Sequence, residues 1–225
     1  GLLRSDIALL YYFLDRIVES KGLPPADFRA DRYVEHPNLT DLPATFTICQ
    51  EFLIGWCSLL YGGAVPLHVL CVIVMGIFAS LCAVGVYGLA IELTGKVRWA
   101  AGAALLYALS PANYRTVGFI LIREDFALPW FTLHLFLLAR AARIGTRTSY
   151  VLCALALVLA LASWHAMGFV VALEAACFFA WFLRSGRNPL AAPNVWLLPA
   201  TVALAALCVP VLRSKVFILS LPMQL

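Results

Sequence analysis

Residues 66–93 read PLHVLCVIVMGIFASLCAVGVYGLAIEL and carry a single charged side chain, that of Glu92. A run of about 18 or more apolar residues is long enough to cross a bilayer as a helix. Hydrophobic residues make up 63% of the chain and charged residues only 12%, whereas about a quarter of the residues in a soluble domain are charged. This composition predicts an all-α, polytopic transmembrane protein.

Further apolar segments precede and follow this run. They lie at about 44–61, 99–112, 126–142, 149–163, 167–183 and 194–212. The connections after the runs ending near residues 93, 142 and 183 hold only basic charges, namely Lys96, Arg98, Arg140, Arg143, Arg147, Arg184 and Arg187. Positive charge in short connections marks the cytoplasmic side. Even numbers of crossings separate these connections, which is consistent with one shared side.

Charged residues are concentrated at the start of the chain. Residues 5–22 have apolar side chains at helical spacing, with Ser5 as a plausible N-cap, and residues 23–43 are rich in proline. Segment 44–61 either spans the membrane or lies flat on it. A carboxylate such as that of Glu51 costs about 2.5–3.5 kcal/mol at the bilayer centre, which favours the flat alternative. Residues 1–65 are then an external, partly helical loop, and residues 66–225 form a transmembrane domain of about six spans.

Three adjacent charges, Arg123, Glu124 and Asp125, end an external connection and open a transmembrane helix. Carboxylates at a helix N-terminus are favoured by the helix dipole, so these charges have a purely structural interpretation. Asp6 supports a second interpretation, because it is also external and also lies at a helix start. Carboxylates from two connections on one face could converge on Mg²⁺ or Mn²⁺, which prefer oxygen ligands and commonly neutralise phosphates.

In order and spacing, residues 1–185 resemble the catalytic subunit of the oligosaccharyltransferases, membrane glycosyltransferases of the GT-C class. YRTVGFILIRED follows the helix end LSPAN, where the family reads roughly S-R-S-V-A-G-S-Y-D-N-E. Upstream, RSDIALLYYFLDRIVESKGLPPADFRADRY is similar to the family's first external loop, with Asp6 at its acidic position. Downstream, SWHAMGFV is similar to W-G-G-[YF].

The resemblance implies that Asp6 and Glu124 are metal-site carboxylates near the pyrophosphate of a lipid-linked sugar donor. Ile122 occupies the position of the first acid in the family's D-x-E pair, and Asp125 is the candidate to replace it. The expected metal ligands are therefore Asp6, Glu124 and Asp125. We also expect Arg115 or Arg123 to offset the phosphate charge.

The expected activity is transfer of a sugar or oligosaccharide from a polyprenyl phosphate or pyrophosphate to a protein acceptor, with asparagine as the expected acceptor residue. The alternatives are a GT-C transferase that uses a lipid-monophosphate sugar on a hydroxyl or lipid acceptor, and a non-catalytic membrane subunit or transporter. The family's later external loop and W-W-D segment would lie beyond Leu225, so we expect the chain to be part of a longer protein. Its membrane would be the endoplasmic reticulum in a eukaryote and the plasma (inner) membrane in a prokaryote.

Other features leave alternatives open or exclude a function. No basic cluster is interleaved with aromatic residues, so nothing supports nucleic-acid binding. His165, beside Trp164, is either an interfacial anchor or a neighbour of the external site. Glu174 lies inside an apolar segment, where a carboxylate is a candidate functional residue. His134 is expected to be a hydrogen-bonded packing residue.

Overall fold

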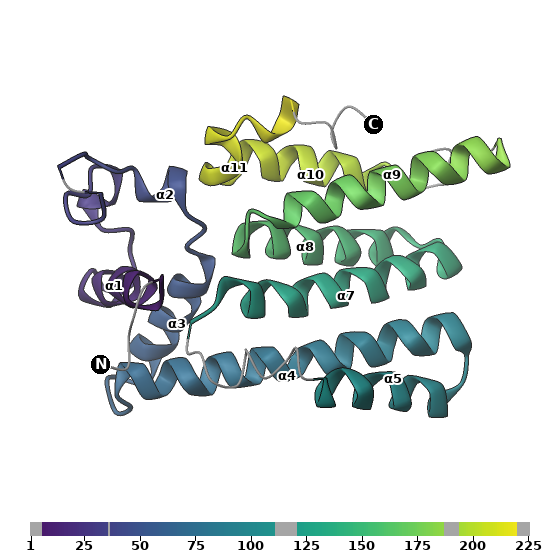
Figure 1. Cartoon of the computed structure of the whole chain (residues 1–225), viewed down its shortest axis with the longest axis horizontal. Coiled ribbons are helices and arrows are strands. Elements are labelled where there is room, and N and C mark those ends of the chain that lie inside the picture. The colour runs from purple at the N-terminus through teal and green to yellow at the C-terminus, as the bar shows by residue number, and fades with distance from the viewer. Residues whose placement is uncertain (1–5, 36, 111–120, 187–193, 220–225) are drawn as a thin grey trace.

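The computed structural model describes residues 6–35, 37–110, 121–186 and 194–219 (Figure 1). Within these ranges the fold is all-helical, as the composition predicted, and one isolated β-bridge joins Asp31 to Thr40. The α-helices of the first region are α1 (Asp6–Glu19), α2 (Leu42–Thr45) and α3 (Cys49–Leu60). The remaining α-helices are α4 (Leu67–Thr94), α5 (Val97–Leu109), α7 (Arg123–Ile144), α8 (Arg147–Ser163), α9 (Met167–Ser185), α10 (Leu197–Cys208) and α11 (Pro210–Ser214).

The long helices form a bundle in which α7 lies between α4 and α8 (Figure 1). Two glycines of α4 allow α7 to approach closely. A Cβ atom on Gly85 would collide with the side chain of Thr132, and one on Gly88 would lie 2.9 Å from the ring of Phe136. Small residues at such contacts let transmembrane helices pack backbone to backbone. The position of α7 beside α4 therefore depends on these two glycines.

Two helices among the described residues, α4 with 28 residues and α9 with 19, are long and apolar enough to cross a membrane. Along α4, large apolar side chains are exposed at Val72, Ile73, Ile77, Leu81 and Val84. Exposed apolar side chains along a helix of this length are what a lipid-facing surface requires.

Helix α3 occupies the second half of the segment for which we considered both spanning and flat placements. Its 12 residues extend about 18 Å, well short of the roughly 30 Å hydrocarbon core. Instead of crossing the bundle, α3 packs against α1, and Ile17 and Ile54 are fully buried in their shared core. The length of α3 agrees with the flat alternative.

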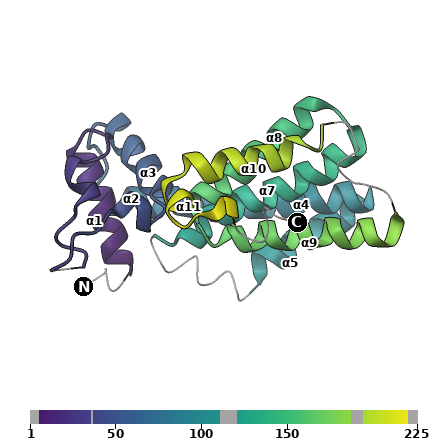
Figure 2. The ribbon, with the colours of Figure 1, turned by 90° about the horizontal axis from the view of Figure 1, so that it is seen from above.

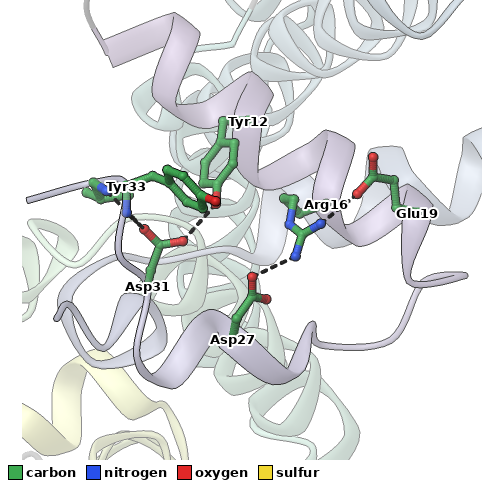
Figure 3. Close-up of polar contacts among 7 residues, drawn as sticks. Tyr12, Arg16, Glu19, Asp27, Asp31 and Tyr33 are labelled. Atoms are coloured by element: carbon green, nitrogen blue, oxygen red, sulfur yellow. Dashed lines mark hydrogen bonds and ion pairs between the residues drawn. The ribbon is translucent and has the colours of Figure 1, made fainter. Parts of the chain in front are cut away.

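The N-terminal region, which contains α1 to α3, is stabilised by polar contacts as well as by this core (Figure 3). Asp31 is buried and accepts a hydrogen bond of 2.8 Å from the hydroxyl of Tyr12 on α1. Its other carboxylate oxygen accepts the backbone N–H groups of Tyr33 and Val34. Asp31 thereby fastens the proline-rich segment, which the sequence indicated only as irregular, to helix α1.

One expected helix is interrupted. The apolar segment predicted over 194–212 forms α10 and α11, separated by Val209 in an extended conformation. Pro210 explains the break, because proline lacks an N–H donor and disfavours helical geometry in the residue before it.

The ends of the bundle differ in character (Figures 1 and 2). The turns after α4 and α7 lie at one end, where Glu92 pairs with Arg143 at 2.8 Å and with Arg140 at 3.6 Å. The first region, the start of α7, the α8–α9 turn and α11 gather at the other end. We call this second end the polar end.

Candidate functional site

The three charges at the start of α7 lie in regular helix. Ile122 is the N-cap residue, and its carbonyl accepts the Phe126 N–H at 3.3 Å. Consecutive residues of an α-helix point about 100° apart. Arg123, Glu124 and Asp125 therefore face different neighbours at the polar end.

Arg123 points toward α3. Its Nη2 donates to Oε1 of Glu51 at 3.3 Å, and its guanidinium carbon lies 5.2 Å from the centre of the Phe46 ring, within the range of a cation–π contact. Glu51 is fully buried, and burial raises the pKa of its carboxyl while the charge of Arg123 opposes that shift. In this structure, the arginine expected to meet a phosphate is held by an internal carboxylate.

Glu124 lies on the side of the α8–α9 turn. His165, in that turn, interacts electrostatically with Glu124, Arg123 and Lys215. Burial lowers the pKa of His165, and the charges of Lys215 and Arg123 lower it further, while Glu124 opposes them. The imidazole is therefore uncharged at neutral pH, and two cations and one carboxylate act on it electrostatically.

Asp125 has different surroundings, toward α4 and α5. It is only 6% exposed, and it interacts electrostatically with Cys82 on α4 and Tyr107 on α5. Asp125 and Glu124 thus belong to different surroundings. A single ion could not draw on both carboxylates without a rearrangement of the first turn of α7.

Two of the predicted site residues are not fully described. Arg115 lies outside the described residues, as does the side chain of Asp6, the first residue of α1. Helix α1 itself belongs to the polar end (Figure 2). In the part of the chain that the structure describes, no group of three or more His, Cys, Asp or Glu side chains is arranged to hold a metal ion. Of the expected carboxylates, the described side chains supply Glu124 alone to the α8–α9 side of the polar end.

Several residues at the polar end were missed or undervalued in the sequence. Glu51 was considered only as an obstacle to membrane crossing, and Lys215 received no role. For His165 the sequence allowed an anchor or a site neighbour, and its electrostatic interaction with Arg123 and Glu124 is compatible with the second alternative. The Pro210 break was the available signal for Lys215, because it ends α10 before the segment that carries this lysine.

No protein-family model matches this chain, and no curated protein sequence matches it either. The grounds for a functional proposal are therefore the composition, the helical fold and the side chains gathered at the polar end.

Proposed function

We propose that this chain is the membrane-embedded part of a GT-C glycosyltransferase that transfers a sugar or oligosaccharide from a polyprenyl phosphate or pyrophosphate to a protein asparagine. Its transmembrane domain comprises about six spans within residues 66–225, with residues 1–65 on the external surface. The observation that supports the proposal is a group of electrostatically interacting side chains at the polar end of an otherwise apolar bundle, namely the charged Arg123, Glu124 and Lys215 and the neutral His165.

This cluster has the chemistry that a lipid-linked phosphate requires. The lipid tail needs an apolar surface, which the exposed side of α4 provides, and the phosphate needs cations at the end of that surface. Arg123 and Lys215 are cations on separate elements, and Arg115 is a further candidate from its position in the sequence. The neutral imidazole of His165 can donate or accept a hydrogen bond to a sugar or phosphate oxygen.

Glu124, together with Asp6, is the proposed ligand pair for Mg²⁺ or Mn²⁺, which would neutralise phosphate charge as the sugar leaves. Asp125 is the less suitable carboxylate, because it is buried toward α4 and α5. The two carboxylates of α7 therefore have separable roles that substitutions can distinguish.

The test is a transfer assay on membranes containing the full-length protein. A polyprenyl-pyrophosphate-linked sugar is the donor and a peptide with an Asn-x-Thr sequence is the acceptor. We expect Glu124→Gln to reduce transfer on the order of 100-fold, and Asp15→Asn, a matched change at an exposed acid on α1, to leave it unchanged. Full activity of Glu124→Gln would remove this carboxylate from the site.

The same assay separates the alternative transferases. In a parallel reaction, a lipid-monophosphate sugar is the donor and a hydroxyl compound is the acceptor, in place of the pyrophosphate-linked sugar and the Asn-x-Thr peptide. Transfer in that reaction alone would replace the asparagine proposal with the second transferase class. Absence of transfer with either donor would refute a glycosyltransferase function.

A further inference from the structure

Two helix N-termini without side-chain caps meet at Arg123. The N-cap residue of α3 is Ile48 and that of α7 is Ile122, and neither side chain accepts a hydrogen bond from its helix. The first N–H groups of a helix carry partial positive charge and favour anions. The Arg123–Glu51 contact joins the first turns of these two helices.

The segment before α3 and the first turn of this helix contact Arg123 and also contain several unsatisfied polar atoms. Phe46 and Glu51 both contact Arg123, and Thr47 and Gln50 lie between them in the chain. Gln50 and Glu51 are fully buried, and Thr47 is 3% exposed. Among the described residues, the Thr47 hydroxyl, both amide atoms of Gln50, Oε2 of Glu51 and Nε of Arg123 have no hydrogen-bond partner.

Such a concentration of unsatisfied groups is costly for a folded protein. Each buried polar atom without a partner costs about 1–3 kcal/mol, and native structures contain few of them. Three of these groups, on Thr47, Gln50 and Arg123, can donate hydrogen bonds. A phosphate at Arg123 would bring several acceptor oxygens to this part of the chain.

The Glu51 carboxylate is a poor partner for Arg123. It receives one hydrogen bond from Arg123, and at 3.3 Å that bond is long for a charge-assisted contact, which is usually about 2.7–2.9 Å. Arginine pairs best with carboxylate or phosphate through two parallel hydrogen bonds. The Glu51 carboxylate is therefore a weakly bonded internal anion that a phosphate could replace.

We propose that Arg123, Gln50 and Thr47 form a phosphate-binding site that Glu51 fills in this structure and vacates when the phosphate group of a donor enters. The inference rests on the proposed function for the identity of that donor, a lipid-linked phosphate or pyrophosphate. The site is closed here because its donors are buried. Withdrawal of the Glu51 side chain frees the guanidinium, and Gln50 and Thr47, which flank the two residues in contact with Arg123, are the nearest unsatisfied donors in the chain.

Calorimetric titration of the detergent-solubilised full-length protein with inorganic pyrophosphate tests the site directly. Glu51→Gln removes the internal anion and should tighten pyrophosphate binding about tenfold, because the phosphate no longer competes with the Glu51 carboxylate for Arg123. Arg123→Gln should lose pyrophosphate binding, and so should the double variant that combines Glu51→Gln with Arg123→Gln. Asp15→Asn should bind as the unmodified protein does. Unchanged or weaker binding by a folded Glu51→Gln variant would overturn the proposal.

A second variant avoids disturbing the ion pair. Gln50→Leu keeps Glu51 and Arg123 and removes only the amide, so it should weaken pyrophosphate binding about tenfold. Equal affinity would overturn the site even where Glu51→Gln folds poorly. A polyprenyl pyrophosphate added in micelles should compete with inorganic pyrophosphate, and failure to compete would assign the site to a free phosphate.

These outcomes are separable from those of the transfer assay. Pyrophosphate binding with the expected variant pattern but without sugar transfer would support the anion site and refute the transferase. Sugar transfer with pyrophosphate binding indifferent to Glu51, Gln50 and Arg123 would refute the anion site and leave the transferase.

Discussion

His134 on α7 and Glu174 on α9 are joined inside the bundle, with imidazole Nε2 lying 2.9 Å from carboxylate Oε1. The other ring nitrogen, Nδ1, lies 2.9 Å from the carbonyl oxygen of Cys153 on α8. That carbonyl can only accept, so Nδ1 carries a hydrogen and one further proton is shared between Nε2 and Glu174. The pair therefore has no net charge, which suits an apolar bundle, and it links three helices.

We expect the His134–Glu174 pair to stabilise α9 against α7 and α8. Glu174→Leu and His134→Leu should each lower the free energy of unfolding by about 1–2 kcal/mol, and the double variant by less than the sum. Glu174→Gln keeps a hydrogen-bonding side chain and should cost less than Glu174→Leu. Unfolding of purified protein in mixed detergent micelles measures all four, and strictly additive losses would contradict a direct interaction.

The glycines of α4 give a second prediction. Gly85→Ala and Gly88→Ala should each destabilise the bundle by about 1–3 kcal/mol, because the new methyl groups would press on Thr132 and Phe136. Gly76→Ala is the matched control in the same helix, since a Cβ there meets nothing within 4 Å. The same unfolding measurement applies. A loss in the control equal to the other two would indicate a general effect of substituting α4.

The helices were predictable because local signals set their ends. The segments expected at 66–93, 149–163 and 167–183 match α4, α8 and α9 to within two residues at either end. Gly95 and Gly186 follow two of these helices with φ of 66° and 64°, a left-handed conformation that glycine adopts at a helix end without steric strain. Apolar length and these end signals are properties of neighbouring residues.

The contacts between side chains far apart in the sequence were not predictable in this way. Arg123 and Glu51 are 72 positions apart, and His134 and Glu174 are 40 apart. No periodicity links such pairs, because their meeting depends on how whole helices rotate and pack. The sequence accordingly identified Arg123 and Glu124 as candidates but assigned Arg123 to a phosphate without its Glu51 partner.

Placement of the two ends of the bundle on opposite sides of a membrane is a third prediction. Ala30→Cys, in the N-terminal region, should react with an impermeant maleimide added from outside. Thr148→Cys, at the end of the bundle opposite the polar end, should react only after the membrane is opened. Both positions are exposed in the structure, so burial does not decide the result. Labelling is compared with that of the unmodified chain, which has seven cysteines of its own. Labelling of both positions from outside would contradict the positive-inside assignment.

The last prediction concerns the pH dependence of stability at His165. Burial lowers the pKa of this imidazole below its ordinary value of 6.5, and its buried Nδ1 has no hydrogen-bond partner among the described residues. A histidine whose pKa is lowered in the folded state binds protons more readily when unfolded. Its contribution to stability is therefore complete above pH 6.5 and is lost as the pH falls through the window below that value.

We expect the unfolding midpoint of the detergent-solubilised protein to decrease as the pH is lowered from about 7.5 to about 5. His165→Gln should remove part of that decrease. Lys215→Met should also reduce it, because removing this charge lessens the repulsion that an imidazolium would meet. The reduction should be smaller than for His165→Gln, since burial is the larger cause of the lowered pKa and remains in place. Arg98→Met, at the end of the bundle opposite the polar end, serves as the control for loss of one positive charge. Equal pH dependence in His165→Gln and the unmodified protein would show that this histidine does not titrate differently in the folded chain. Its proposed electrostatic interaction with Arg123 and Glu124 would then fail.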